Sequence, residues 1–271
     1  MEEMTKEDLK LKISQLKAEK KRYDIVNAAL KISLNGSYGK LGSMYSFLYA
    51  PDLMLTVTIT GQLMLLMLIE QLSLNGIRVV SSNTDGIEYY CPRDKVNLAE
   101  TIIFDWELIT GMTMEHGEYK GLYAENVNNY VAVYDGYTKA KGIYAETTLM
   151  KGRSTPVVYS AIREYLLNGT DIKEFINNCK DINEFVSGRT VKGGGVWKGE
   201  YLGKVVRWYY SINGDVITYM QNGNKVPKTG EMNGVKPIMN LTDNIPEDLD
   251  YSWYYSEAIK KLDKLGVTYE S

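Results

Sequence analysis

One short segment of the sequence carries a carboxylate in a position suited to phosphoryl chemistry. In VVSSNTDGIEYY, residues 79–90, a β-branched run enters the tight-turn tetrapeptide Asn83-Thr84-Asp85-Gly86 and leaves through a second short run. Asn and Asp beside Gly are hairpin-turn residues, so the segment predicts two short strands with the Asp85 carboxylate at the tip. That carboxylate is either ordinary turn chemistry or a metal ligand, because phosphoryl transfer commonly uses two divalent ions bridged by aspartates.

A second segment, LKISLNGSYGKLG at residues 30–42, carries a lysine, an amide and a phenol at helical spacing. Lys31, Asn35 and Tyr38 stand at i, i+4 and i+7, so they share one face of a helix. The lysine would neutralise phosphate charge, and the tyrosine would lie against a base. The competing interpretation is a solvated helix face that ends in a glycine cap.

The composition excludes several kinds of functional site. The chain has one histidine, His116, and two cysteines, Cys91 and Cys179, with no CxxC pair. It therefore lacks the ligands for a zinc cluster and the cysteines for a disulfide scaffold. A histidine-dependent nucleophile would have to use His116, which lies in EHGEY with no nucleophile signature nearby. Catalysis is expected to use carboxylates, lysines or oxygen-held metals.

Charge and tyrosine content favour a polar binding surface. The net charge is −3, but residues 189–236 hold eight basic and three acidic residues, whereas seven acidic and three basic residues follow from Thr242 onward. The chain therefore allows a local basic face despite its overall charge. The 22 tyrosines against four phenylalanines suit a nucleic-acid cleft, where a ring can stack and its hydroxyl stays wet.

The start of the chain and one uncharged run bear on location. The N-terminus is charged and carries no signal peptide. Residues 53–69 are uncharged between Asp52 and Glu70, but they contain three Thr, a Gly and a Gln. This composition favours a buried helix over a membrane helix. We expect a soluble, cytoplasmic protein with no membrane partner.

The order of elements predicts an α+β fold, since helices and hairpins alternate without βαβ winding. Helices are expected at 5–36, where Gly36 and Gly39 end the first, and at 51–75, 95–110, 157–168, 171–179, 181–186 and 248–265. Extended segments are expected at 45–50, in hairpins at 77–90 and 130–144 (strands 130–134 and 140–144), and from the glycines at 192–195 onward. A domain boundary is expected near Met150 to Pro156.

Together, and about fifty residues apart, the two opening segments resemble motifs of the family B DNA polymerases, particularly bacteriophage members. Lys31-x-x-x-Asn35-Gly36-Ser37-Tyr38-Gly39 is similar to the fingers motif Lys-x-x-x-Asn-Ser-x-Tyr-Gly, and Asn83-Thr84-Asp85-Gly86 is similar to the palm motif Asp-Thr-Asp-Ser. Asn129-Tyr130 and Lys141-Gly142 resemble the segments that hold primer and template, and TITGQ at 58–62 resembles the palm helix.

The resemblance implies roles for residues around the nucleotide. Lys31 would contact the incoming triphosphate of a dNTP, and Asn35 would help to form the nucleotide pocket. Tyr38 would line the minor-groove side of the nascent base pair. Asp85 would be the catalytic carboxylate of this chain and a ligand of Mg²⁺ in a two-metal site.

The resemblance also implies a primer–template DNA interface and a division into domains. Tyr130 and Lys141 would contact the primer–template, and Lys204 and Arg207, next to Trp208, would hold duplex phosphates. The implied fold is α+β, with a polymerase palm made of an antiparallel sheet and packed helices. Residues 1–39 would be partial fingers, 40–152 the palm, and 153–271 a mixed α/β thumb.

Four departures from the family pattern affect the expected function. Gly36 stands where the family has Ser, Asn83 replaces the first Asp of the palm motif, and Asn128 stands where Lys is expected. The motif with the other metal-binding Asp, of the form Asp-x-x-Ser-Leu-Tyr-Pro, has no counterpart here, nor do an exonuclease domain or the first fingers helix. Because the chain starts with Met and a helix cap, we expect a split polymerase in which an N-terminal subunit brings those parts.

On this hypothesis the chain alone is inactive, because one aspartate cannot hold two ions. A fragment or a degenerate relic would have the same sequence. The alternative from another class is a non-catalytic DNA-binding or processivity module that retains the polymerase shape. A palm-type RNA polymerase or reverse transcriptase is disfavoured by the Lys31–Gly39 motif before the Asp85 turn.

Overall fold

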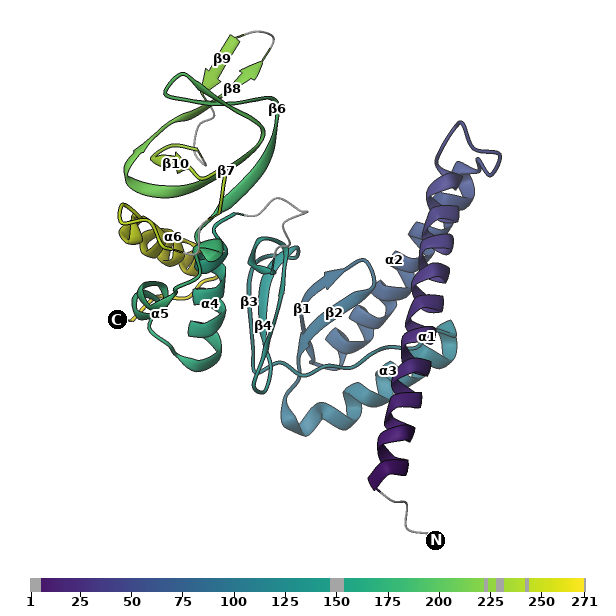
Figure 1. Ribbon diagram of the computed structural model, residues 1–271. Coiled ribbons are helices and arrows are strands. Elements are labelled where there is room, and N and C mark those ends of the chain that lie inside the picture. The colour runs from purple at the N-terminus through teal and green to yellow at the C-terminus, as the bar shows by residue number, and fades with distance from the viewer. Residues whose placement is uncertain (1–5, 147–153, 222–223, 228–231, 242–243, 271) are drawn as a thin grey trace. The chain divides into compact units, whose positions relative to one another are not determined.

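The computed structural model describes residues 6–146, 154–221, 224–227, 232–241 and 244–270 (Figure 1). The chain divides into two compact units, Met1–Met114 and Glu115–Ser271. This division falls inside the predicted palm. The division shows which residues form compact units, and it does not assign them to polymerase domains. The assignment to fingers, palm and thumb therefore stays a prediction. The boundary predicted near Met150 to Pro156 coincides largely with residues 147–153, which lie outside the described part of the chain.

The described residues of the first unit form three α-helices and one hairpin, which confirms the predicted order of helices and hairpin. The elements are α1 (Lys6–Leu41), α2 (Pro51–Leu74), β1 (Arg78–Asn83), β2 (Gly86–Tyr90), the 3-10 turn η1 (Arg93–Lys95) and α3 (Val96–Thr110). Gly111 ends α3 in the left-handed conformation, with φ of 69° and its N–H bonded to the Glu107 carbonyl, as a helix-ending glycine does.

Two local predictions in this unit were wrong. Helix α1 runs through Gly36 and Gly39 and ends at Leu41, because a glycine weakens a helix by only about 1 kcal/mol and long flanking turns outweigh that cost. The Ser37 hydroxyl also donates to the Ser33 carbonyl within these turns (2.9 Å). Residues 45–50 form turns instead of a strand, with the Tyr49 N–H bonded to the Ser46 carbonyl (3.1 Å).

The core of the first unit lies where α2 and α3 pack beneath the hairpin. On α3 the buried residues recur at i, i+4 and i+7, which places them on one face of the helix. The buried cluster consists of Leu68, Leu72, Ile77, Ala99, Ile103 and Trp106, with Val79, Ile87 and Tyr89 of the hairpin packed against it. The Trp106 indole N–H donates to the Met64 carbonyl on α2 (2.7 Å), which fixes α3 against α2.

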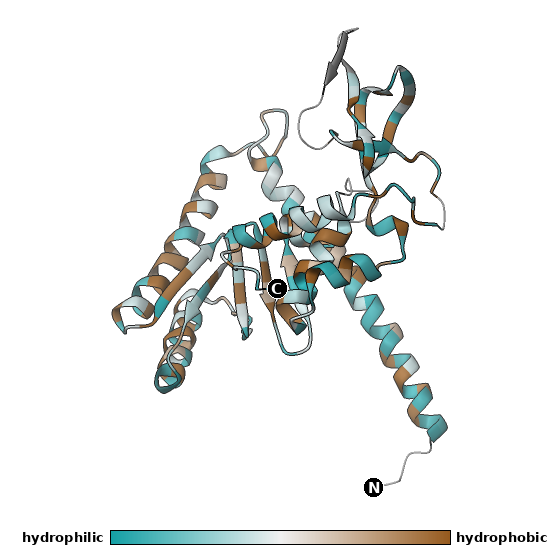
Figure 2. Ribbon diagram, turned by 90° about the vertical axis from the view of Figure 1, so that its left-hand side faces the viewer, coloured by the Kyte–Doolittle hydropathy of each residue, from teal (hydrophilic) through white to brown (hydrophobic). Residues whose placement is uncertain are grey.

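Helix α2 forms as predicted, but it is not the buried helix that its composition suggested. Leu68 and Leu72 are its only buried residues. Of its most apolar 18-residue stretch, 6% is buried. Figure 2 shows hydrophobic residues along much of this helix. Within the described residues, α2 alone is long and apolar enough to cross a membrane by length and composition. The prediction of burial failed because the described elements of this unit cover one face of α2.

The described residues of the second unit form two antiparallel sheets and three α-helices. The sheets have the strand orders β3-β4-β5 and β10-β7-β6-β8-β9. The elements are β3 (Gly121–Asn126), β4 (Asn129–Val133), β5 (Thr138–Lys141), η2 (Gly142–Tyr144), α4 (Pro156–Asn168), α5 (Ile172–Asn178), η4 (Ile182–Glu184), β6 (Ser187–Trp197), β7 (Glu200–Asp215), β8 (Ile217–Gln221), β9 (Asn224–Pro227), β10 (Val235–Pro237) and α6 (Tyr251–Lys264).

Three predictions differ from this arrangement. Strand β3 was not predicted, the strand expected at 140–144 ends at Lys141, and the helix expected at 181–186 is one 3-10 turn. The last two segments are short, and their final conformation depends on what they pack against. The helices expected at 157–168, 171–179 and 248–265 are present within a few residues.

A buried tyrosine joins the sheet and the helices of the second unit. The Tyr254 hydroxyl on α6 donates to the Phe185 carbonyl (2.7 Å) and accepts from the Tyr210 N–H on β7 (2.9 Å). Burial strongly raises the pKa of Tyr254, so the hydroxyl stays protonated. The core around Tyr254 includes buried apolar side chains from α4, α5, β7 and α6.

Candidate active site and nucleic-acid interface

Asp85 lies at the tip of the β1–β2 hairpin, as predicted. The last cross-strand pair is Asn83 with Gly86, which leaves Thr84 and Asp85 as a two-residue loop. Thr84 has a φ of 39°, a value that β-branched residues rarely adopt and that costs about 1–3 kcal/mol. Its hydroxyl donates to the Asn83 side-chain oxygen (3.0 Å). The tip is therefore held in one strained conformation, which is a recurrent feature of functional turns.

The Asp85 carboxylate is exposed and forms no side-chain hydrogen bond or ion pair with the described residues. The hairpin beneath it is anchored, because Val79, Ile87 and Tyr89 pack onto the α2–α3 core. A rigid mount with an unpaired carboxylate suits a metal ligand. The tip therefore offers one carboxylate ligand from a fixed position.

One further carboxylate on the hairpin was not singled out from the sequence. Glu88 on β2 lies opposite Ser81, and its Oε2 atom is buried without a hydrogen-bond partner among the described residues. The sequence signal for this residue was a single charged side chain, Glu88, in the otherwise uncharged strand GIEYY. Buried acceptors are usually satisfied, so the unpartnered Oε2 of Glu88 is an exception among the described residues.

The described residues contain no group of three or more His, Cys, Asp or Glu side chains placed to hold a metal ion. Magnesium takes oxygen ligands, usually one or two carboxylates together with substrate phosphates and water. Asp85 fits such a site as one ligand. A two-metal site needs at least one further carboxylate beside Asp85.

Lys31, Asn35 and Tyr38 lie on exposed positions of α1, at the spacing that places them on one helix face. The Tyr38 hydroxyl is 2.6 Å from the Thr58 hydroxyl on α2. Because Thr58 donates its single proton to the Met54 carbonyl (2.9 Å), Tyr38 is the donor in this pair. The bond holds the end of the Lys31 face against the helix that also supports the Asp85 hairpin.

Tyr130 and Lys141 are brought together in the second unit. They form a cross-strand pair between β4 and β5, so their side chains lie on the same face of the three-stranded sheet. Gly142 follows Lys141 with a φ of 68°, and a Cβ there would lie 2.1 Å from the Asn128 carbonyl and the Asn129 side-chain oxygen. The Asn129 oxygen also accepts from the Ile143 N–H (2.9 Å). Two segments singled out separately from the sequence thus form one surface.

Lys204 and Arg207 are not brought together in this way. They are three residues apart on β7, and side chains alternate between the faces of a strand, so they point to opposite faces. Lys204 is exposed, whereas Arg207 is half-buried and donates from Nη1 to the Met239 carbonyl (3.1 Å). Trp208, expected beside them, is buried in the core. Only part of this segment is therefore placed to contact a duplex.

Two further basic residues of the 189–236 segment have partners within the fold. Lys236 pairs with Asp248 (2.9 Å), and the Lys198 ammonium lies 4.7 Å from the centre of the Trp197 ring. The Lys225 side chain and Lys228 lie outside the described part. The Lys236–Asp248 ion pair therefore neutralises one charge of the predicted basic face.

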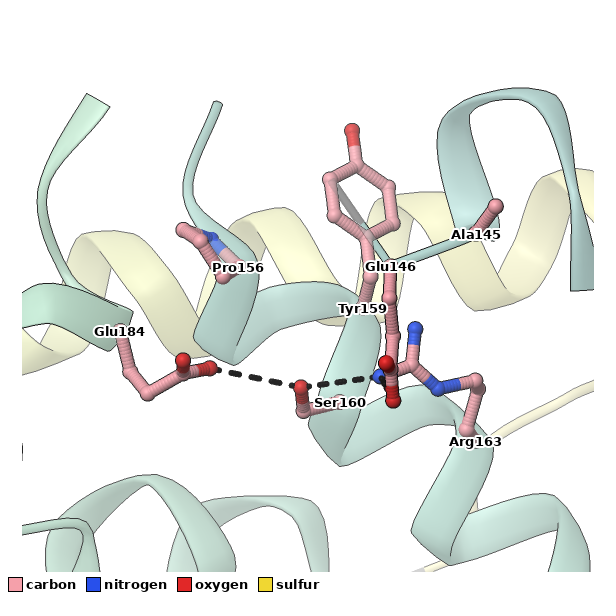
Figure 3. A pocket seen from close by; sticks show the side chains of 7 residues that line it. All are labelled: Ala145, Glu146, Pro156, Tyr159, Ser160, Arg163 and Glu184. Carbon is pink, nitrogen blue, oxygen red and sulfur yellow. Dashed lines mark hydrogen bonds and ion pairs between the residues drawn. The ribbon is translucent and has the colours of Figure 1, made fainter. Parts of the chain in front are cut away.

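A cavity of about 260 Å³ in the second unit holds none of the predicted site residues (Figure 3). The guanidinium of Arg163 on α4 lines the cavity. It donates to the Tyr144 carbonyl (2.8 Å) and the Ser160 hydroxyl (3.2 Å). Glu146 and Glu184 complete the polar lining. Burial lowers the pKa of Arg163, but the side chain remains a cation whose bonds connect η2 to α4.

Comparison with known proteins points to one class for the first unit. Residues 2–102 match the family model described as DNA polymerase family B. This range contains α1, α2, the Asp85 hairpin and the beginning of α3, whereas Tyr130 and Lys141 lie beyond it. The match supports a relationship to the DNA-replicating polymerases of family B.

Three curated proteins named DNA polymerase 1 are similar to this chain. That of Sulfolobus acidocaldarius is 30% identical over 153 residues, which cover 54% of this chain and 16% of the relative. The protein of Saccharolobus solfataricus is 28% identical over 180 residues (59% and 19%), and that of Sulfurisphaera ohwakuensis is 29% identical over 163 residues (55% and 18%). The matched part is thus less than a fifth of the length of each relative.

Proposed function

We propose that this chain is the C-terminal part of a replicative family B DNA polymerase, of bacteriophage type, that catalyses template-directed nucleotidyl transfer. The observation that carries the proposal is Asp85, an exposed carboxylate on a strained, well-supported hairpin within the residues that match the family. The similarity to three proteins named DNA polymerase 1 supports it. The chain would work in the cytoplasm, that of the host cell if a phage encodes it.

In this proposal the α1 face receives the incoming dNTP. Lys31 neutralises triphosphate charge, Asn35 forms part of the pocket wall, and Tyr38 lies against the nascent base pair. The Tyr38–Thr58 hydrogen bond supports the last role, because it fixes the ring relative to α2. Asp85 is one ligand of Mg²⁺, and the metal supplies charge neutralisation at the reacting phosphate.

Primer–template DNA binds to the second unit in this proposal. The Tyr130 and Lys141 pair offers a ring and a cation on one sheet face, a combination that suits a sugar–phosphate backbone. Lys204 contributes a phosphate contact, and Arg207 contributes those N–H groups that the Met239 carbonyl does not use.

The second carboxylate of the two-metal site comes from a partner polypeptide in this proposal. That partner carries the first palm motif, of the form Asp-x-x-Ser-Leu-Tyr, together with the exonuclease. The small fraction of each relative that this chain matches supports the need for further polymerase sequence. On this view the chain alone does not extend primers.

The test is primer extension with Mg²⁺, using this chain with and without the polypeptide from the same genome that carries the Asp-x-x-Ser-Leu-Tyr segment. Asp85→Asn should lower the rate of the mixture at least about 1,000-fold, since it removes a metal ligand. Asp105→Asn, an exposed aspartate of α3, is the matched control and should leave the rate unchanged. Full activity of Asp85→Asn would favour the non-catalytic DNA-binding module, and robust synthesis by this chain alone would refute the partner.

A further inference from the structure

The β4–β5 hairpin continues in register beyond the last residues of its two strands. Val133 pairs with Thr138, and the next residue, Tyr134, donates its N–H to the Tyr137 carbonyl (2.9 Å). Gly136, with a φ of 80°, lies in the two-residue turn that remains between these tyrosines. Tyr134 and Tyr137 therefore close the hairpin as its last cross-strand pair.

The two faces of this hairpin differ in what they present. Val131 and Val133 on β4 belong to the core of the second unit, where they are 0% and 6% exposed. Because side chains alternate along a strand, every second cross-strand pair lies on the opposite face. The pairs of that face are, in order, Tyr130 with Lys141, Ala132 with Lys139, and Tyr134 with Tyr137. Successive pairs are about 7 Å apart along the strands, so the tyrosines and lysines line one surface around the small, buried Ala132.

Three tyrosine rings at the closed end of the hairpin form an ordered group. Tyr137 stacks on Tyr134, with 4.7 Å between the ring centroids and 4° between the ring planes. The Tyr119 ring meets Tyr134 edge-on, at 5.2 Å and 78°. Tyr134 is half-buried, whereas Tyr137 is 54% exposed. Stacking on Tyr134 uses one face of the Tyr137 ring, so a further flat ring can stack on the exposed part at a small entropic cost.

The charges near these rings fit a polyanion. Lys139 and Lys141 are exposed, and neither side chain forms a hydrogen bond or ion pair with another described residue. Asp135 is the one acidic residue in the sequence between Asn129 and Lys141, and it pairs with Lys120 (2.5 Å). Two lysines on the face that carries the rings are therefore placed to contact phosphates.

The combination of rings and lysines distinguishes between two forms of DNA. A duplex presents phosphates, but its bases are already paired and stacked on one another. Single-stranded DNA presents phosphates together with uncovered base faces, and proteins bind it with basic surfaces and aromatic rings on which the bases stack. The end of the β4–β5 hairpin therefore fits a single strand better than a duplex.

We infer that Tyr137, supported by Tyr134, is a stacking site for a base of single-stranded DNA, and that Lys139 and Lys141 contact the phosphates of the same strand. The proposed function assigns Tyr130 and Lys141 to primer–template DNA and gives Tyr137 and Lys139 no role. The inference rests on that proposal only where the single strand continues from the duplex at Tyr130. Tyr130 and Tyr134 are about 14 Å apart along β4, which is the length of about four stacked nucleotides.

The test measures the Kd of the full chain for an oligothymidylate of about 12 nucleotides and for a duplex of the same length, by fluorescence anisotropy. Tyr137→Ala should weaken binding of the oligothymidylate about 5- to 100-fold, the effect of one lost base–aromatic stack, and should change duplex binding less than about 2-fold. Tyr137→Trp, which keeps a stacking ring, should bind as the unmodified chain does. Tyr201→Ala, at a tyrosine of β7 that is 59% exposed, is the matched control and should change neither Kd.

Two further measurements do not depend on the Tyr137→Ala variant. Lys139→Gln should lower the slope of log Kd for the oligothymidylate against log salt by about 0.7, the loss of one phosphate contact to a single strand. Irradiation of the unmodified chain with an oligonucleotide that contains iodouracil should cross-link the base to Tyr137, because the two rings are stacked. Mass spectrometry identifies the cross-linked residue.

Three outcomes would overturn the stacking site. The first is an unchanged Kd for the oligothymidylate in Tyr137→Ala, which would limit the ring to a role in hairpin stability. The second is an equal loss of single-strand and duplex binding in that variant, once circular dichroism shows that it is folded. The third is cross-linking confined to residues other than Tyr137. An unchanged salt slope in Lys139→Gln would exclude its phosphate contact.

Failure of the proposed function is distinguishable from failure of the stacking site. If Tyr137 binds the oligothymidylate but the mixture with the partner polypeptide does not extend primers, the stacking site stands and polymerase activity fails. If the mixture extends primers while Tyr137→Ala binds the oligothymidylate normally, the proposed function stands and the stacking site fails.

Discussion

The carboxylate of Asp248 is predicted to be a main support of the second unit. Its Oδ1 accepts from the Tyr209 hydroxyl (2.8 Å), and its Oδ2 accepts from the Ser211 hydroxyl (3.0 Å) and the Lys236 ammonium (2.9 Å). These residues lie on β7 and β10, whereas Asp248 precedes α6. Asp248 therefore joins two strands to the segment that leads into the last helix.

The cost of removing this carboxylate follows from burial and bond type. The Asp248 side chain is 16% exposed and that of Lys236 is 42% exposed. Asp248→Ala leaves two mostly buried hydroxyls without their acceptor and a cation without its partner, at a cost of about 3–5 kcal/mol. Asp248→Asn keeps the shape and one acceptor and should cost about 1–2 kcal/mol. Lys236→Met should cost at most about 1 kcal/mol, because a half-exposed ion pair is screened by solvent.

Thermal unfolding, followed by tryptophan fluorescence and circular dichroism, measures these differences. For a unit of this size, 1 kcal/mol corresponds to about 2–4 °C, so Asp248→Ala should lower Tm by about 10 °C. A loss below about 1 kcal/mol for Asp248→Ala would refute the reasoning. So would a loss for Lys236→Met equal to that for Asp248→Ala, since the hydroxyl bonds would then contribute nothing.

The same group predicts a dependence on pH. Burial raises the pKa of the Asp248 carboxyl, but the hydrogen bonds from Lys236, Tyr209 and Ser211 outweigh burial and hold the pKa below its usual value. A carboxyl with a lowered folded pKa contributes stability above its unfolded pKa, about 3.9, and that stability is lost as the pH falls further. The Tm difference between the unmodified chain and Asp248→Asn should therefore be constant near neutral pH and shrink below about pH 4. A constant difference down to pH 2 would contradict this assignment.

Three further predictions test the other sites. Gly142→Ala should destabilise the second unit by at least about 2 kcal/mol in urea unfolding, because the new Cβ meets the Asn129 side chain at 2.1 Å and the residue has a positive φ; unchanged stability would show that this close approach relaxes. Lys141→Gln should reduce the slope of log Kd for duplex DNA against log salt by about 0.7–0.9, the loss of one phosphate contact, and an unchanged slope would exclude that contact. Trp106→Phe should cost about 1–3 kcal/mol in the first unit through the lost bond to the Met64 carbonyl and the lost ring volume, and a cost below 0.5 kcal/mol would contradict that role.

Local chemistry explains which elements could be predicted. The Asp85 hairpin follows from turn residues beside Gly86, and the end of α3 follows from Gly111, since both depend on a few neighbouring residues. The face shared by Lys31 and Tyr38 follows from helical periodicity. The same local rules failed at Gly36, where a glycine was read as a helix end although α1 continues past it. A glycine permits a break without requiring one.

Pairing between distant segments could not be predicted in the same way. The β4–β5 register that places Tyr130 opposite Lys141 depends on which strands meet and with what offset. The ion pair between Lys236 and Asp248 likewise joins a basic segment to an acidic one that the sequence shows only as separate charge runs. The acidic segment after Thr242 therefore serves the fold at least through Asp248, a role that composition left open.

The sequence by itself determined the chemical groups and their local mounts: a carboxylate on a turn, a lysine–amide–phenol face on a helix, and a relationship to polymerase motifs that the family match supports. Tertiary structure decided which of these groups are available. It set Lys204 and Arg207 on opposite faces of β7, engaged Arg207 with the Met239 carbonyl, and left one side of α2 exposed. The physical reason is that residue type and periodicity act over a few residues, whereas burial and pairing depend on chain segments that meet only in the folded protein.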